Sequence, residues 1–461
     1  MKKMIRIASG QGFWGDNPQA PIDQVRKGPI DYLVMDYLAE VTMSIMQKQK
    51  MRDPRTGFAR DIIPLMKEIL PDIMEKNIRV ITNAGGVNPV ACRDAIFEVA
   101  ERMGIKDLKI GIVDGDDILD RIDELLDAGV KLDHMDTGEP LSKVRERLYS
   151  ANVYLGARPV VEALQQGAQI IITGRVTDTG LTLAPMVYEF GWQWDEYDKL
   201  AAGIVAGHII ECGPQSSGGN FLAGWKEVPD MAHIGFPLIE AEPSGEFVVT
   251  KHENSGGLVD ERTVKEQLLY ELGDPTDYIT PDVVADFTSI RLKPDGANRV
   301  RVYGVKGKPE TDLYKVSISY SDGWTCIGHL TYAWPEALEK AKMADQIIRE
   351  RIRFLGLEFE EIHTEFLGVN ACHGPLSHPV EDPNEVVLQI GVRGSNLGHI
   401  ERFSREMIPL VLGGPPTVTG FASGRPRPKE VVAYWPALIP KELVTPRVSV
   451  EAVGKNGGDA K

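Results

Sequence analysis

The segment QIIITGRVTDTGLTLAPMVYEF, residues 169–190, decides the fold. It begins with an apolar run that ends at Thr173, continues through a short polar turn from Gly174 to Asp178, and then becomes a longer apolar segment. A short apolar run bounded by a glycine turn predicts a buried strand, and the longer segment predicts a helix. This stretch therefore predicts one strand–turn–helix unit of a parallel sheet.

The same order of elements recurs on both sides of this segment. Strands are predicted at residues 4–8, 79–82 and 108–113, and each is followed by a loop of small or polar residues. Helices are predicted at residues 31–47, 62–75, 90–103 and 196–210. Because strands and helices alternate, the sequence predicts an α/β domain with a largely parallel sheet flanked by helices.

The pattern changes near residue 285. Consecutive strands separated by turn signals are predicted at residues 285–292, 299–305, 314–321 and 325–332, before a helix at 335–354. Strands at 361–367 and 386–392 and a helix at 397–410 follow. We therefore predict an α/β domain at residues 1–284 that carries the candidate site, a smaller α+β domain with an antiparallel sheet at 285–453, and a disordered tail at 454–461.

The composition of the chain restricts its partners. The 461 residues are 43% hydrophobic and 26% charged, with a net charge of -16. An acidic surface disfavours nucleic acids and anionic membranes as partners, because both attract basic patches. The four cysteines form no CxxC pair, and no apolar run approaches the roughly 20 residues of a membrane span. We expect a cytoplasmic enzyme that acts on a small anionic molecule and forms homo-oligomers.

The turn after residue 173 is the first candidate for a ligand site. In open parallel sheets, ligands bind beyond the carboxyl ends of the strands. Arg175 follows such a strand, and its guanidinium can bind a carboxylate or phosphate in a fork, with Gly174 allowing close approach. Asp178 is either an acid/base catalyst or a helix N-cap, and an ion pair between the two side chains is the structural alternative.

A second candidate turn follows the strand at residues 79–82. Gly85 and Gly86 can form an anion-binding nest, while Asn83 or Asn88 can donate to a carbonyl oxygen. The alternative is an ordinary turn in which Asn88 caps the next helix.

Two further loops are rich in small residues. At one of them, Cys212 can act as a nucleophile with His208 as its base, and Ser216 and Ser217 are alternative nucleophiles. The remainder of that loop, Gly218, Gly219 and Asn220, can cradle a phosphate. The other loop contributes Gly10, Gln11, Gly12 and Trp14 as candidate substrate-binding residues.

Signals for metals are weak. His373 and His378 lie in a loop that is more typical of a solvated turn, and Asp114, Asp116 and Asp117 fit an acidic helix start better than a magnesium site. We predict no metal, and the sequence requires no cofactor.

Four of these motifs together resemble the acyclic terpene utilisation (AtuA-type) family. They are SGQGFWGD at residues 9–16, ITNAGGVNP at 81–89, ITGRVTD at 172–178 and CGPQSSGGNF at 212–221. The resemblance covers nearly the whole chain. It implies a role in the breakdown of acyclic terpenes through acyl-CoA esters, with CoA as part of the substrate. One role it implies is that of a lyase for a branched, 3-hydroxy-3-methylglutaryl-like thioester.

These observations lead to one functional prediction and two alternatives. We predict a carbon–carbon or carbon–oxygen lyase for a branched acyl-CoA or related carboxylate. Arg175, Asn83 and the Gly85–Gly86 backbone would stabilise the enolate, and Asp178, or else His208, would transfer protons. The alternatives are a hydrolase or transferase that uses Cys212 or a serine, and a non-catalytic subunit that needs a partner protein.

Overall fold

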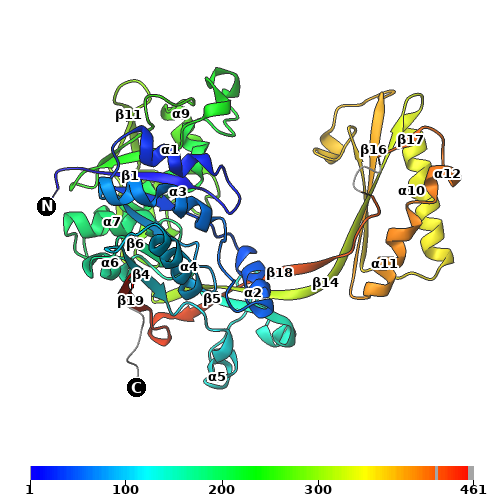
Figure 1. The fold of residues 1–461 in the computed structure, drawn as a ribbon. Helices are drawn as coiled ribbons and strands as arrows, with labels where there is room; N and C mark the ends of the chain where they lie inside the picture. The colour runs from blue at the N-terminus through cyan, green and yellow to red at the C-terminus, as the bar shows by residue number, and fades with distance from the viewer. Residues whose placement is uncertain (1, 421–423, 455–461) are drawn as a thin grey trace. The chain divides into compact units, whose positions relative to one another are not determined.

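The chain folds into two compact units. The computed structural model describes residues 2–420 and 424–454. One unit comprises residues 2–319 and 434–454, and the other comprises residues 320–433 (Figure 1). Two long strands, β14 (Leu313–Ala333) and β18 (Lys429–Pro440), contribute residues to both units. Apart from Gly454, the predicted tail lies outside the described residues.

A ten-stranded sheet organises the first unit. Five adjacent strands at its centre run parallel, namely β1 (Ile5–Gln11), β2 (Tyr32–Met35), β3 (Arg79–Thr82), β6 (Ile170–Thr173) and β4 (Lys109–Asp114). All residues of β2 and β6 are buried, as expected for strands covered on both faces. This central section matches the predicted parallel sheet.

Antiparallel strands extend the sheet on both sides, so the sheet is mixed and the prediction of a largely parallel sheet was too simple. On one side lie β7 (Leu238–Ala241), β8 (Phe247–Thr250), β12 (Val300–Tyr303) and β11 (Arg291–Pro294), and on the other lies β19 (Arg447–Ala452). Short turns join β7 to β8 and β11 to β12. Such connections permit only antiparallel pairing, because a parallel crossover needs a dozen or more residues.

Helices cover both faces of the parallel section. One buried core packs strand residues such as Leu33 and Val80 against α3 (Ile62–Lys76) and α4 (Pro89–Arg102). On the opposite face, α7 (Gly180–Phe190) contacts β1 and β2 and packs against α8 (Tyr197–Glu211). The remaining helices and strands of this unit are α1 (Gln19–Lys27), α2 (Thr42–Arg52), α5 (Ile122–Asp127), α6 (Arg158–Gln165), α9 (Glu261–Leu269), β5 (Leu148–Val153), β9 (Tyr278–Ile279), β10 (Val284–Asp286) and β13 (Lys306–Lys308).

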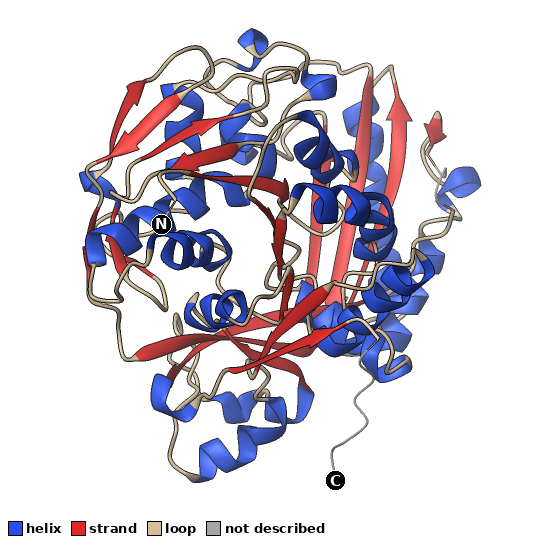
Figure 2. Cartoon of the chain, turned by 60° about the vertical axis from the view of Figure 1, so that its left-hand side comes forward, coloured by secondary structure: helices blue, strands red, loops and turns tan. Residues whose placement is uncertain are grey.

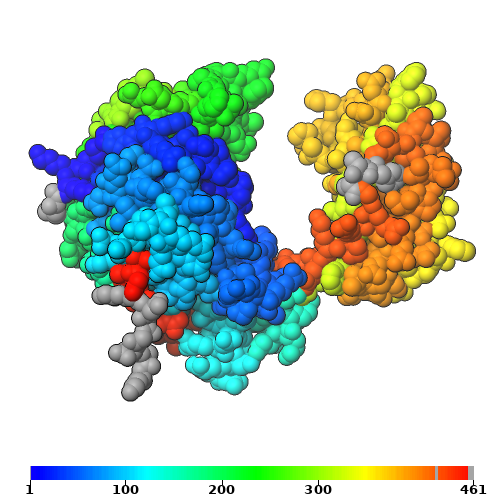
Figure 3. Space-filling view, in the orientation of Figure 1, coloured from blue at the N-terminus to red at the C-terminus, as the bar shows by residue number. Residues whose placement is uncertain are grey.

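Pairings between distant parts of the sequence are visible on the surface of this unit. In Figure 3, the dark blue of the first residues adjoins the green of residues near 240, and a red patch of C-terminal residues lies among the cyan ones. These neighbours correspond to the pairings β1–β7 and β4–β19. The C-terminal strand therefore belongs to the first unit, and the predicted boundary at residue 284 differs from the structural division.

The predicted helix at residues 31–47 was wrong. The chain forms the strand β2, then a loop, and only then α2. The apolar run of β2 was read as part of a helix because a short buried strand and a buried helix segment have the same hydrophobic pattern. This difference matters for the site, because it places residues 36–41 in a loop at the carboxyl end of a central strand.

The predicted strands at residues 314–321 and 325–332 form one strand, β14, instead of a hairpin. Gly323 has a positive φ of 82°, and a Cβ atom built on it would lie 2.8 Å from the carbonyl oxygen of Gly394. The glycine therefore allows close approach to a neighbouring strand and makes no turn. The predicted strand at 285–292 is divided between β10 and β11.

The second unit is built on an antiparallel sheet, as predicted. β14 lies between β16 (Glu385–Gly394) and the short β17 (Val418–Thr419), and β15 (Glu361–Leu367) pairs with β16. Alternate residues of β16 are buried against α10 (Ala337–Phe354) and α11 (Leu397–Glu406), and α12 (Leu410–Gly413) follows. Figure 2 shows these long strands in red beside the blue helices. Among the described helices, none combines the length and the hydrophobicity of a transmembrane span.

Candidate functional site

A cavity of about 530 Å³ lies at the carboxyl ends of the parallel strands. The loops after β1, β2 and β6 form its walls, together with the segments that follow α8 and α9. Its charged lining residues are Asp16, Asp36, Glu40, Arg175, Asp178, Glu211 and Glu271. The loop that follows β6 thus meets the loops after β1 and β2 at one cavity, the position at which open α/β sheets bind ligands.

Arg175 supplies the one cation of this lining. Its side chain is 3% exposed, lies 3.0 Å from Oδ1 of Asp178, and donates to the backbone oxygen of Leu38. The guanidinium also stacks over the Tyr154 ring at 4.2 Å. Burial alone would lower the pKa of Arg175, but the nearby Asp178 carboxylate raises it overall, so the guanidinium stays charged. Among the described residues, its Nε has no hydrogen-bond partner.

Asp116 stabilises the turn that contains Arg175. This carboxyl accepts hydrogen bonds from the backbone N–H of Arg175 and from the side chain of Asn152, both at 2.9 Å. A Cβ atom at position 174 would lie 2.3 Å from Oδ1 of Asp116, so a larger residue there would displace this carboxyl group. Burial raises the pKa of Asp116 to about 6. Gly174 and Asp116 therefore fix the turn and do not line the cavity.

Asn83 lies behind the cavity wall and positions Asp36. Its amide nitrogen donates to Oδ1 of Asp36 at 2.6 Å, and its oxygen accepts from the backbone N–H of Tyr37 at 2.7 Å. Asn83 is fully buried, whereas Asp36 lines the cavity. Burial, together with the nearby Asp178 carboxylate, raises the pKa of Asp36 well above its ordinary value. The structure thus gives Asn83 a positioning role.

His208 is also buried behind the cavity. Its Nδ1 lies 3.1 Å from Oε1 of Glu211, and its Nε2 lies 3.0 Å from the backbone oxygen of Gln267. Burial would lower the pKa of His208, but the hydrogen bond and charge of Glu211 raise it overall. Burial also raises the pKa of Glu211. Glu211, and not His208, is the member of this pair that reaches the cavity.

The predicted nucleophiles have unfavourable surroundings. Cys212 lines the cavity, but burial and the neighbouring Glu211 raise the pKa of its thiol to about 12, which disfavours the reactive thiolate. Ser216 and Ser217 are fully buried in a short 3₁₀ turn and do not line the cavity. A hydroxyl without access to the cavity cannot attack a substrate there.

Only some residues of the two glycine-rich loops line the cavity. Gly12, Gly219 and Asn220 line the cavity, whereas Gly218 packs against Val228. Gly10 lies in β1, where a Cβ atom would meet Leu33, Met35 and Pro21, and Gln11 donates to the backbone oxygen of Phe13. Trp14 lies outside the cavity, where its indole nitrogen donates to Asp61 at 2.8 Å.

The turn at residues 83–89 does not form the expected anion nest at the cavity. The backbone N–H groups of Gly86 and Asn88 donate to the oxygens of Asn83 and Gly85 within the turn. Asn88 caps α4 through its side chain and donates to two backbone oxygens of a neighbouring loop. Gly85 packs against the oxygen of Thr173. These donors are occupied, and the capping alternative is the one the structure shows.

The acidic lining is the feature that the sequence analysis missed. Asp36 and Glu40 fall within residues that were predicted to be helical. Glu211 lies at the end of α8, from which only His208 was named as a candidate. Because carboxyl groups outnumber the single guanidinium, the cavity does not favour a free anion. Within residues 2–420 and 424–454, no three His, Cys, Asp or Glu side chains are placed to hold a metal ion together.

An apolar groove of about 680 Å³ adjoins the cavity and shares Asn220 and Tyr270 with it. Its other apolar lining residues are Phe221, Leu222, Trp225, Met231 and Leu269. Leu222 is 86% exposed and Leu269 is 71% exposed. Exposed apolar side chains gathered in one patch are typical of surfaces that bind an apolar ligand or a partner.

The fold and this cavity define an α/β protein with an acid-lined candidate site at the carboxyl ends of a parallel sheet section. The chain belongs to the acyclic terpene utilisation family, described as "Acyclic terpene utilisation family protein AtuA", which it matches over residues 5–450. No curated protein matches the chain, and no solved structure matches it either. Family membership thus indicates involvement in the use of acyclic terpenes.

Proposed function

We propose that this protein is an enzyme, a lyase that cleaves a carbon–carbon or carbon–oxygen bond in a branched acyl group derived from an acyclic terpene. The observation that carries the proposal is the cavity itself, in which one buried guanidinium meets several carboxyl groups beside an apolar groove. The acyl group would be carried as a CoA thioester, because the carboxyl groups of the lining disfavour a free carboxylate.

The groove suits the hydrocarbon part of such a substrate. Acyclic terpene chains are branched and apolar, and the groove offers Leu222, Trp225 and Leu269 as exposed contacts. Burying such a chain is favourable in proportion to the apolar area removed from water, roughly 25 cal/mol per Å². The acid-lined cavity then receives the neutral, oxygen-bearing end of the acyl group.

The cavity holds the groups that a lyase needs. Cleavage beside a carbonyl requires a base, a proton donor and a positive group that stabilises the developing enolate oxygen. Asp178, paired with Arg175, is a carboxylate that can accept a proton, while Asp36 and Glu211 have raised pKa values and can donate one. Arg175 provides the positive charge, with an unused Nε–H.

The test is turnover of branched 3-hydroxyacyl-CoA thioesters by the purified chain, with products identified by mass spectrometry. We expect Asp178→Asn and Glu211→Gln each to lower kcat by roughly 100-fold to 10,000-fold, the usual contribution of a general acid or base. Asp123→Asn is the matched control, because that side chain pairs with Arg145 on the surface and lies outside the cavity.

Two results would contradict the proposal. Full turnover by Arg175→Ala would show that the guanidinium group takes no part in the reaction. Activity that appears only when a second protein is added would make the chain a subunit of a larger enzyme. The covalent alternative is less favoured, because Cys212 has a raised pKa and both serines are buried away from the cavity.

A further inference from the structure

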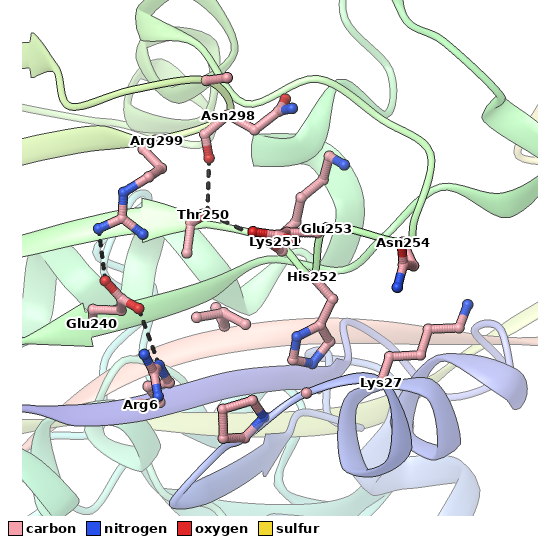
Figure 4. Close-up of a pocket in the computed structure, with 14 residues that line it drawn as sticks. Arg6, Lys27, Glu240, Thr250, Lys251, His252, Glu253, Asn254, Asn298 and Arg299 are labelled. Carbon is pink, nitrogen blue, oxygen red and sulfur yellow. Dashed lines mark hydrogen bonds and ion pairs between the residues drawn. The ribbon is translucent and has the colours of Figure 1, made fainter.

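A second cavity, of about 560 Å³, lies at the other end of β1. It opens where β1 pairs with the antiparallel part of the sheet, and strands β7 and β8 and the loops after α1 and before β12 contribute to its walls. Its basic lining residues are Arg6, Lys27, Lys251, His252 and Arg299 (Figure 4). Arg6 and Gly12 are six positions apart along the extended chain, about 20 Å, so this cavity is separate from the acid-lined one.

One carboxylate in this cavity is shared by two guanidinium groups. Glu240 stands opposite Arg6 in the β1–β7 register and accepts from its Nε at 3.0 Å, while Arg299 donates to the other carboxylate oxygen at 2.7 Å. Figure 4 shows Glu240 between the two arginines. Arg299 also lies 3.4 Å from Asp295, outside the cavity lining. Within the lining, this trio carries one net positive charge.

Lys251 is a buried cation in the lining of this cavity. It is 8% exposed, and its ammonium donates to the backbone oxygen of Ser255 at 2.7 Å. Among the described residues, no carboxylate forms an ion pair with Lys251. An ammonium group has three donors, and a buried charge is costly unless it is paired. Burial lowers the pKa of Lys251, as expected for a cation without a counter-ion.

The other polar groups of the lining include two further basic side chains, two amides and one further carboxylate, that of Glu253. Lys27 is exposed at the cavity and pairs with Asp23 at 2.6 Å. His252 lies between Lys27 and the arginines in Figure 4, and its Nε2 is 3.1 Å from the backbone oxygen of Gln24. The side-chain amides of Asn254 and Asn298 also line the cavity. Because the whole chain carries a charge of -16, a concentration of cations here is a local feature.

These groups suit an anion with several oxygen atoms. A cation ligand would be repelled by Lys251 and the arginines, and an apolar ligand would leave their charges without partners. Arginine binds phosphate oxygens in a fork, and lysine binds them as a point charge. The volume exceeds that of a free phosphate ion and lies within the range of small-molecule sites.

We propose that this second cavity binds the phosphate group of a small phosphorylated molecule, with Lys251 as its buried counter-ion and Arg6, Arg299 and Lys27 around it. The site goes beyond the proposed lyase function and does not depend on it. A bound phosphate would supply the missing counter-charge of Lys251 and accept its two remaining N–H groups.

Isothermal titration calorimetry of the full chain tests this proposal at constant ionic strength in a chloride buffer. The two probes are inorganic phosphate and adenosine 5′-monophosphate, which distinguish a free phosphate from a phosphate ester. We expect the ester to bind and Lys251→Met to weaken it by about tenfold or more, since a charge-assisted contact is lost. Lys27→Met, at an exposed position, should weaken binding by a smaller factor.

The control variant is Lys342→Met, which makes the same change in an exposed helical ion pair of the second unit. It should bind the ester as the unchanged chain does. Lys27→Met keeps the test valid if Lys251→Met fails to fold, because the Lys27 side chain is at the surface. Binding of inorganic phosphate alone would support the site with a free ion as its occupant. No binding of either probe, or equal affinity in every variant, would overturn the proposal.

Discussion

Two buried carboxyls show how single residues control the candidate site. Asp36 lines the cavity and is held by Asn83, whereas Asp116 lies behind the turn that carries Arg175. Burial raises the pKa of both groups. A carboxyl whose protonated form is favoured in the folded state can donate a proton, but it also makes the stability of the protein depend on pH.

The first prediction concerns Asp116. Its pKa rises from 3.8 to about 6 on folding, so its stabilising contribution is complete below pH 3.8 and is lost as the pH rises through about 6. The loss amounts to about 3 kcal/mol, at about 1.4 kcal/mol per pKa unit. We expect Asp116→Asn to remove this part of the pH dependence, measured by urea unfolding between pH 4 and 7.

The surface variant Asp123→Asn is the control for this experiment, because Asp123 is exposed and pairs with Arg145. Its stability profile should keep the slope of the unchanged chain between pH 4 and 7. Parallel profiles for Asp116→Asn and the unchanged chain would show that Asp116 titrates normally in the folded protein.

The second prediction concerns the thiols. At neutral pH, Cys212 should react slowly with iodoacetamide, because its pKa is raised to about 12 and the thiolate is the reactive form. The exposed Cys372 should be alkylated first. Intact-mass and peptide mass spectrometry will give the order. Alkylation of Cys212 at the rate of Cys372, with protection by substrate, would instead favour the covalent alternative.

At the scale of elements, the strand–turn–helix units build the site by packing their turns against neighbouring strands. The turn after β3 touches the end of β6, because Gly85 lies against the backbone oxygen of Thr173. This contact supports both Asn83, which positions Asp36, and the strand that leads to Arg175. The two turns are in contact although Gly85 and Thr173 are about ninety residues apart in the sequence.

The third prediction tests this contact. In Gly85→Ala, the new Cβ atom would lie 2.5 Å from the Thr173 oxygen, so the backbone must shift. We expect a loss of about 1–3 kcal/mol in the free energy of unfolding, the usual cost of overpacking. Gly273→Ala is the control, because a Cβ atom there meets nothing within 4 Å. Equal stability of the two variants in urea unfolding would contradict the packing argument.

At the scale of the whole molecule, each of the two units has a hydrophobic core of its own among the described residues. One packs β2, β3 and β6 against α3 and α4, and the other packs β14 and β16 against α10 and α11. The candidate cavity, the apolar groove and the basic cavity all lie in the first unit. A core that belongs to one unit should affect the stability of that unit first.

The fourth prediction follows from these two cores. Differential scanning calorimetry should resolve two transitions, and Phe403→Ala, at a fully buried position, should lower only the transition of residues 320–433. The expected loss is about 3–5 kcal/mol, typical of removing a buried phenylalanine. Phe354→Ala, at a position that is 85% exposed in the same unit, should change little. A single transition that shifts as a whole would show that the two units unfold together.

Much of the fold could be predicted from local sequence. The apolar run at residues 170–173, its glycine turn and the helix after it follow from periodicity and turn chemistry, which act between neighbouring residues. The same reasoning located the strand of Arg79–Thr82, the helix of Ile62–Lys76 and the position of Arg175 and Asp178 at a strand end. Family membership could also be read from four short motifs, and the family match over residues 5–450 confirms it.

The tertiary structure alone decided which strands pair and which side chains meet. No local pattern shows that β7 adds to β1 in the antiparallel direction, or that a buried run at Tyr32–Met35 is a strand and not part of a helix. For that reason Asp36 was missed as a candidate, and Asn83 was predicted to stabilise the enolate directly. Hydrophobic periodicity records how much of a segment is buried, whereas the partners of a buried side chain depend on residues far away in the sequence.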